Sequence, residues 1–282
     1  MDSSSAAPTN TCWKVWQKHR REYCPFLEDR RDLSHGYEFL ELLAEAGHSH
    51  VIKVRLQGNI YALKLYNLKH VYWTPRRFEQ HALKYDPFMV ECQVYDSLTE
   101  EKLLGRVGPY CFGWLTLDTE EERKLVKKFP KAAALRPTPD ITAKEPIRGL
   151  LLEYIDGYRL EKALLTPAGA QSLRDQLNHL HTLDIAHGDF FPRNIMVSKD
   201  GRVLLIDFSA AIIWPHSNFL VRKREDFLEY IESEKSLLEY YLFRLQQLKR
   251  HEDVKLTEAK SEEDAYGQTP SDWIREQYGF VD

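Results

Sequence analysis

Side chains that could bind a metal and move a proton gather in the stretch from His187 to Ser209. Asp189 and Asn194 share its first polar segment, and Asp207 lies near its end. Carboxylate and amide oxygens suit a hard cation such as Mg²⁺, which takes waters and phosphate oxygens as its other ligands. These residue types therefore predict a magnesium site that also receives a phosphate-bearing molecule.

The apolar residues between these side chains predict the element that positions them. Ile195–Val197 and Val203–Ile206 are short apolar runs separated by a turn at Lys199–Gly201, a pattern typical of a β-hairpin. The polar segment precedes the first strand and Asp207 follows the second, so Asn194 and Asp207 should lie at the same end of two paired strands. The alternative is an ordinary hairpin with acidic turns.

A second group of elements precedes this stretch. Residues Tyr37–Leu43, Val51–Leu56 and Ile60–Tyr66 predict a three-stranded antiparallel meander, because apolar and polar residues alternate in the second and third runs. A helix should follow from Pro87 to about Leu104. Glu91 in its first turns is our candidate partner for Lys64 in the third strand, since such a pair would fix the ammonium group in place.

The remaining pattern completes an α+β fold, with an antiparallel sheet and a helix followed by a mostly helical part. We expect a charged surface excursion at Asp118–Pro146 that holds a helix over Thr119–Phe129. The other expected elements are strands at Tyr110–Leu117 and Gly149–Ile155, a helix at Thr166–Ile185 and one or two helices within Phe219–Arg250. The predicted divisions are an extension at 1–36, a first lobe at 37–155, a second lobe at 156–250 and a tail at 251–282.

Composition limits the functional classes. The chain has 282 residues, a formal net charge of -4 and a pI near 6.3, so no overall positive charge favours nucleic acid or membrane as a partner. Its four cysteines are scattered without a Cys-x-x-Cys pair, which favours free thiols in a reducing compartment over a zinc site. We expect a cytoplasmic protein, with a nuclear location left open.

The motifs together resemble the protein-kinase-like superfamily. His187-Gly188-Asp189 stands where these enzymes have His-Arg-Asp, and Asn194 falls at the position of their catalytic-loop asparagine. Asp207-Phe208-Ser209 looks like Asp-Phe-Gly, and Tyr61-Ala62-Leu63-Lys64 looks like the Ala-x-Lys of the third kinase strand. The resemblance implies a two-lobed kinase-like fold that binds ATP and Mg²⁺.

The resemblance also implies roles for single residues. Asp207 and Asn194 would hold Mg²⁺, and Asp189 would orient the attacking hydroxyl and accept its proton. Lys64, paired with Glu91, would contact the phosphates. Where kinases carry a lysine two residues after the catalytic aspartate, this chain has Phe191, and Arg193 is the nearest cation that could substitute. The residues implied at the adenine are Ala62, Val51 and the backbones of Glu153 and Ile155.

One departure from the pattern keeps alternatives open. The turn at 46–51 contains a single glycine, where protein kinases have a Gly-rich loop, and small-molecule kinases resembling aminoglycoside phosphotransferases also lack the full glycine pattern. We expect transfer of the γ-phosphate to a hydroxyl, of a protein serine or threonine. The alternatives are a small-molecule phosphotransferase and a nucleotide-binding pseudokinase. The expected partners are ATP and the hydroxyl acceptor, without nucleic acid or membrane.

Overall fold

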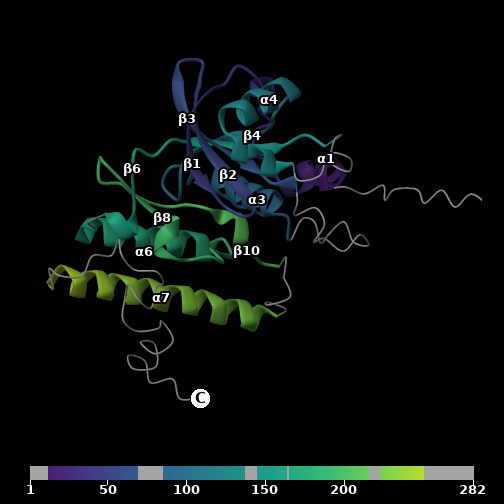
Figure 1. Ribbon diagram of the computed structural model, residues 1–282. Coiled ribbons are helices and arrows are strands. Elements are labelled where there is room, and N and C mark those ends of the chain that lie inside the picture. Colours follow the sequence, from purple (N-terminus) through teal and green to yellow (C-terminus); the bar gives the residue numbers. More distant parts are fainter. Residues whose placement is uncertain (1–11, 69–84, 137–144, 164, 216–222, 251–282) are drawn as a thin grey trace, which may run out of the picture. The chain divides into compact units, whose positions relative to one another are not determined.

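The computed structural model describes residues 12–68, 85–136, 145–163, 165–215 and 223–250 (Figure 1). The expected tail at 251–282 lies outside them. The chain divides into two compact units. The first comprises Met1–Tyr154 with Phe208–Ala210, and the second comprises Ile155–Asp207 with Ala211–Asp282.

A five-stranded antiparallel sheet forms the centre of the first unit, in the order β1-β2-β3-β5-β4. Together with the helices it confirms the predicted α+β class. Successive side chains along each strand point to opposite faces of the sheet. In its register Val51 on β2 lies opposite Lys64 on β3, and Lys64 lies opposite Leu150 on β5, so the three residues share one face. The strands are β1 (Glu38–Glu45), β2 (Ser49–Leu56), β3 (Asn59–Tyr66), β4 (Cys111–Thr116) and β5 (Arg148–Glu153).

One face of this sheet is covered by the segment between β4 and β5. Helix α4 (Thr119–Lys128) and the 3-10 helix η3 (Pro130–Leu135) bury Leu125 and Leu135 against Ile52 and Leu63. The prediction of a helix here agrees with α4, but the prediction of a surface excursion is wrong. Frequent charged residues concealed the few apolar positions with which the segment closes the core.

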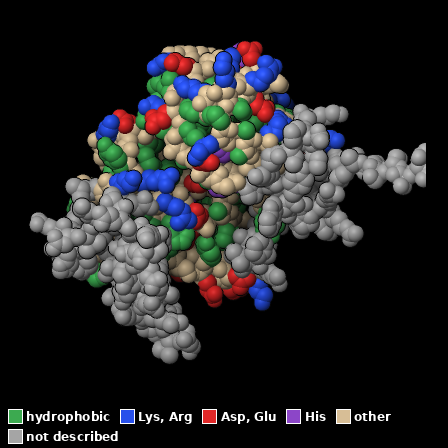
Figure 2. Space-filling model, in the orientation of Figure 1, with side chains coloured by type: hydrophobic (Ala, Val, Ile, Leu, Met, Phe, Trp, Pro, Cys, Tyr) green, Lys and Arg blue, Asp and Glu red, His purple; other side chains and the backbone are tan. Residues whose placement is uncertain are grey.

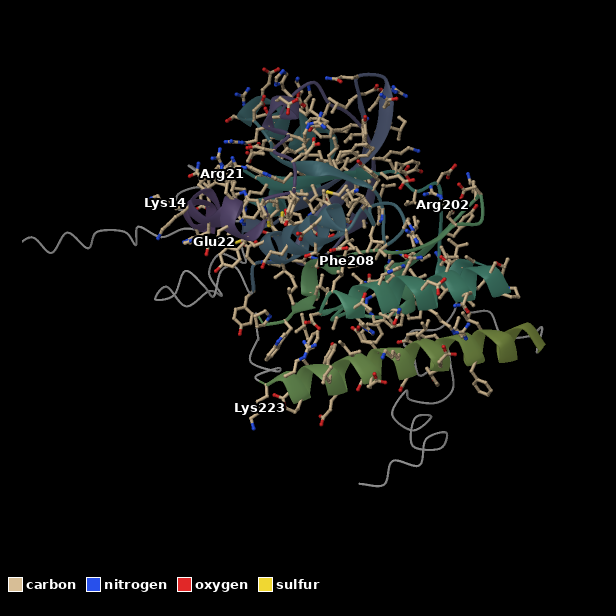
Figure 3. The ribbon with its side chains drawn as sticks, turned by 180° about the vertical axis from the view of Figure 1, so that it is seen from behind. Lys14, Arg21, Glu22, Arg202, Phe208 and Lys223 are labelled. Carbon is tan, nitrogen blue, oxygen red and sulfur yellow. The ribbon has the colours of Figure 1, made fainter. Side chains whose placement is uncertain are left out.

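The N-terminal segment is part of the first unit's core. Helix α1 (Cys12–Tyr23) buries Trp16 against Trp114 of β4, with ring centroids 5.4 Å apart, while Lys14 and Glu22 extend outward (Figure 3). Farther along, the Trp114 N–H donates to the Glu28 carbonyl at 3.0 Å. This approach requires Gly113, because a Cβ there would lie 2.5 Å from the Glu28 oxygen.

Helix α3 (Pro87–Glu100) begins at Asp86, whose carboxylate accepts from two backbone N–H groups of the first turn. It ends at Glu100 rather than near the predicted Leu104. Lys102 has a φ of 58°, and the Leu103 N–H returns to the Leu98 carbonyl at 2.8 Å, which is a helix-ending geometry. Sequence reasoning placed the end later because the left-handed residue is a lysine rather than a glycine.

Asp96 joins α3 to the N-terminal segment. Its Oδ1 accepts from the N–H groups of Phe26 and Leu27, each at 2.7 Å. Burial raises the pKa of Asp96 to about 6, although these two hydrogen bonds act in the opposite direction.

The raised pKa predicts a pH dependence of stability. Between the ordinary pKa of aspartate, about 4, and the folded value of about 6, the folded protein binds more protons at Asp96 than the unfolded chain does. The contribution of Asp96 to the free energy of unfolding therefore falls as pH rises through this window. Asp96→Asn keeps an acceptor oxygen and does not titrate, so it should reduce the dependence of the free energy of unfolding on pH in this window. Denaturant unfolding at pH 4 to 7 measures this, and an unchanged slope would contradict it.

Two small sheets and two helices make up the described part of the second unit. Strands β6 (Gly157–Arg159), β8 (Ile195–Ser198) and β9 (Val203–Leu205) form one sheet. Within it β8 and β9 pair antiparallel as the predicted hairpin, with Ile195 opposite Leu205. Strands β7 (Ile185–Ala186) and β10 (Ile212–Ile213) form the second pair.

The helices of the second unit lie side by side (Figure 1). Helix α6 (Pro167–Thr182) stops before the predicted end at Ile185, because Asp184 has a φ of 58° and Ile185 enters a strand. Helix α7 (Arg224–Arg250) is one continuous helix. A bidentate ion pair between Arg174 and Glu239 joins the two helices. Within the described residues, none of the helices has the length and apolar character needed to span a bilayer.

Candidate functional site

The first unit contains a buried ion pair on one face of its sheet. Lys64 Nζ donates to Glu91 Oε2 at 2.5 Å, and the two side chains are only 4% and 1% exposed. The Tyr66 hydroxyl donates to the same oxygen at 2.5 Å. The structure thus brings the predicted pair together and adds a tyrosine that sequence reasoning missed, although its position two residues after Lys64 on a strand is a usable signal.

Other predicted nucleotide-binding residues share the face of Lys64. Val51 lies directly opposite Lys64, and Ala62 lies two residues before it on the same strand. Ala62 lies between Leu152 of β5 and Lys53 of β2, so this face carries small and apolar side chains together with the buried Lys64 ammonium group. Such a surface can accept a flat, apolar ring next to a charged group.

The second unit positions Asp189 by short hydrogen bonds within one loop. Arg193 Nη2 donates to Asp189 Oδ1 at 2.5 Å, and Asn194 Nδ2 donates to Oδ2 at 2.8 Å. The 3-10 helix η5 (Pro192–Asn194) makes this possible by turning the chain back. The Arg193 guanidinium lies 4.3 Å from the ring centroid of Phe191, so the residue at the lysine position of kinases supports a cation instead of supplying one.

Asn194 and Asp207 lie at the same end of the hairpin, as the sequence predicts. The Ile206 N–H donates to the Asn194 carbonyl at 2.8 Å, which continues the β8–β9 pairing by one step. Asp207 itself has a φ of 65°, a strained conformation for a residue with a side chain. Such conformations persist where the surrounding structure imposes them, and they concentrate at functional positions.

The available oxygen atoms fit a magnesium–phosphate complex better than a metal held by protein alone. The Asn194 amide N–H group donates to the backbone carbonyl and to Oδ2 of Asp189, so Oδ1 is the side-chain oxygen that it can offer to a cation. Within the described residues, no three His, Cys, Asp or Glu side chains gather as a metal site would need. Mg²⁺ takes only one or two protein carboxylates and completes its shell with water and substrate phosphates, so this set suits it.

Glu234, a buried residue of α7, holds the start of the loop that carries Asp189. Glu234 accepts from the backbone N–H groups of His187 at 3.0 Å and Gly188 at 2.8 Å. Its Oε2 also lies 2.9 Å from Nε2 of the His181 ring. The Tyr230 hydroxyl donates to the Gly188 carbonyl at 3.2 Å. Burial, assisted by Glu234 and Asp189, raises the pKa of Tyr230 to about 12. Sequence reasoning missed Glu234, whose signal is a charge on the apolar face of a helix.

The three residues directly after Asp207, Phe208–Ala210, belong to the first unit. Phe208, labelled in Figure 3, is fully buried and its ring stands edge-on to Tyr95 of α3 at 5.5 Å. Ser209 Oγ lies 3.0 Å from Nε2 of His48, in the turn that occupies the place of a Gly-rich loop. The His48 side chain thus contacts the Asp-Phe-Ser segment from a turn that is rich in glycine in protein kinases.

The two predicted hinge residues fall on either side of the division between the units. Glu153 ends β5 in the first unit, and its N–H donates to the Tyr110 carbonyl at 2.8 Å. Ile155 begins the second unit. Lys64 and Glu91 therefore belong to the first unit, while Asp189, Arg193, Asn194 and Asp207 belong to the second.

The visible surface carries charges of both signs. On the described part of the face in Figure 2, blue and red side chains alternate across the surface without one broad area of a single sign. The small net charge of -4 agrees with this mixture.

Residues 25–212 match the model of a family described as "Kinetochore Sim4 complex subunit FTA2". The chain is also 24% identical over 188 residues to the serine/threonine-protein kinase PKH3 of Saccharomyces cerevisiae. That match covers 66% of this chain but only 18% of the yeast kinase, so the similarity is limited to a domain-sized part of it.

Proposed function

Because the chain belongs to the family of the kinetochore Sim4 complex subunit FTA2 and has a kinase-like domain, we propose that it is an ATP-dependent phosphotransferase of a kinetochore assembly. It binds Mg-ATP and transfers the γ-phosphate to a hydroxyl of a protein serine or threonine. Kinetochores form on chromosomes, so the proposal favours the nuclear location over the cytoplasmic one.

The buried Lys64–Glu91 pair carries this proposal. Removing two charges from water costs several kcal/mol per ion, by rough estimate, and apolar residues of similar volume often stabilise a core as well or better. A pair that is 4% and 1% exposed is therefore poorly explained by stability alone. It is well explained by a need to hold one ammonium group ready for phosphate oxygens.

The second unit supplies the other groups that phosphoryl transfer requires. Asn194 Oδ1 and the Asp207 carboxylate would hold Mg²⁺, which neutralises phosphate charge when it is bound. Asp189 would accept a hydrogen bond from the attacking hydroxyl and take its proton late in the transfer. Arg193, held by Asp189 and Phe191, would lie where a cation can meet the transferred phosphoryl group.

The same residues would serve a small-molecule acceptor, because they act on the nucleotide and on one hydroxyl. The family membership and the yeast kinase favour a protein acceptor. The description of that family as a subunit of an assembly agrees with a substrate that is another protein of the assembly.

A second candidate is a nucleotide-binding subunit that does not transfer phosphate. One observation favours it: both carboxylate oxygens of Asp189 are already engaged, by Arg193 and by Asn194. An attacking hydroxyl would have to compete with these two donors for the Asp189 oxygens, which disfavours a role as the base. In this case nucleotide binding would regulate assembly.

Nucleotide binding is the first expected result. A ligand that binds only the folded state stabilises it by about 2.7 kcal/mol at a hundredfold excess over its dissociation constant. Thermal unfolding of the full chain should therefore move to higher temperature with ATP and Mg²⁺. An unchanged midpoint at millimolar Mg-ATP would reject both candidates. A shift without transfer from γ-labelled ATP to purified kinetochore proteins, generic proteins or small alcohols would favour the second candidate.

A further inference from the structure

Tyr66 is the least expected member of the buried pair's surroundings. It lies on the same face of β3 as Lys64, two residues later, and its hydroxyl donates to the Glu91 oxygen that also accepts from Lys64. The tyrosine side chain is almost fully buried. A single carboxylate oxygen thus receives two strong hydrogen bonds from neighbouring positions of one strand.

The position of this hydroxyl is fixed by packing. The Tyr66 ring stands edge-on to Phe88 in the first turn of α3, with centroids 5.3 Å apart. Lys64 Nζ lies 5.4 Å from the Tyr66 ring centroid, over the ring. Tyr66 therefore contacts all three parts of the arrangement: the helix that holds Glu91, the carboxylate and the ammonium group.

The second hydrogen bond has a reason if Lys64 has to serve two partners. An ammonium group has three N–H donors, and a bound phosphate would take one or more of them from Glu91. If Lys64 were the only donor to Glu91, moving N–H groups to a phosphate would leave the buried carboxylate short of hydrogen bonds. That cost in free energy would weaken phosphate binding. A hydroxyl that stays on Glu91 throughout removes much of that cost.

We propose that Tyr66 is a positioning residue. Its hydroxyl holds the carboxylate of Glu91, on α3, against β3 and so leaves the Lys64 ammonium group able to bind the phosphates of a nucleotide. The inference rests on the proposed binding of ATP. It assigns Tyr66 no contact with the nucleotide, and its effect passes entirely through Glu91.

Tyr66→Phe removes only the hydroxyl. Because the hydroxyl acts on phosphate binding, Mg-ATP should bind about tenfold more weakly, the size of one charge-assisted hydrogen bond, while adenosine, which has no phosphate, should bind within about twofold of wild type. Tyr37→Phe is the matched control, since Tyr37 is also buried in the first unit and its hydroxyl donates to the Leu33 carbonyl, away from Lys64. Isothermal titration of the full chain with each ligand measures these affinities.

Two further outcomes decide the inference. In a Glu91→Gln background, Tyr66→Phe should cause little additional loss of Mg-ATP affinity, because its effect passes through Glu91. Equal weakening of ATP and adenosine by Tyr66→Phe, or full additivity with Glu91→Gln, would show a merely structural role and overturn the inference. Wild-type protein that binds adenosine and ATP equally would overturn it as well. Wild-type protein that binds neither would instead reject the proposed function, and the inference with it.

Discussion

Asp189→Asn is expected to lower the rate of phosphoryl transfer by about 10²–10⁴-fold, the usual contribution of a general base. The amide has nearly the shape of the carboxylate but cannot take the proton of the attacking hydroxyl. Asp189 is not itself an expected metal ligand, and the asparagine oxygen can still accept from Asn194, so the affinity for Mg-ATP should change little. Initial rates with γ-labelled ATP and isothermal titration measure the two quantities separately.

The matched control for this variant is Asp175→Asn. Asp175 lies on α6 in the same unit, is exposed and accepts a hydrogen bond from Gln171 at 2.9 Å. It makes the same change of charge away from the loop, and its rate should equal that of wild type. A fully active Asp189→Asn protein, assayed on an acceptor that wild type phosphorylates, would show that Asp189 is not the base.

Lys64→Met is expected to abolish detectable nucleotide binding and to destabilise the first unit. Removing the ammonium group leaves the Glu91 charge buried with only the Tyr66 hydroxyl for support. Breaking a buried pair in this way typically costs about 3–5 kcal/mol. Denaturant unfolding measures the stability loss, and isothermal titration with Mg-ATP measures the loss of binding.

A second substitution separates the two effects. Glu91→Gln added to Lys64→Met removes the unpaired charge, so the double variant should recover most of the stability without recovering nucleotide binding. Lys131→Met is the control, because Lys131 is 72% exposed and pairs with Glu45 at 2.9 Å on the surface. Such exposed pairs contribute about 0–1 kcal/mol. Wild-type affinity for Mg-ATP in the double variant would show that Lys64 does not bind the nucleotide.

The sequence predicted the elements with regular patterns and the residues carried by them. Strands β2 and β3 alternate over six or more positions and form where that pattern predicts, and the structure adds their register, with Val51 opposite Lys64. The apolar runs around Lys199–Gly201 gave the hairpin that brings Asn194 near Asp207. In each case the local pattern and the tertiary role agree, which is the situation in which sequence reasoning works best.

The features that were missed depend on contacts between distant parts of the chain. Nothing near Asp96 in the sequence indicates that it accepts hydrogen bonds from Phe26 and Leu27. Glu234 is one glutamate among several on α7 until the loop at His187 is placed against it. Helix ends were also missed where lysine or aspartate, rather than glycine, adopts a positive φ, because intrinsic preference disfavours those residues there.

The assignment of Phe208 to the first unit has a consequence for the order of synthesis. A ribosome completes Met1–Tyr154 first, but the ring that fills the core beside Tyr95 arrives only after Ile155–Asp207 of the second unit has followed. Deleting a buried phenylalanine ring costs a folded core about 3–5 kcal/mol. The nascent first unit therefore lacks that contribution until Phe208 has left the exit tunnel, so its core is completed only after Ile155–Asp207 has been synthesised.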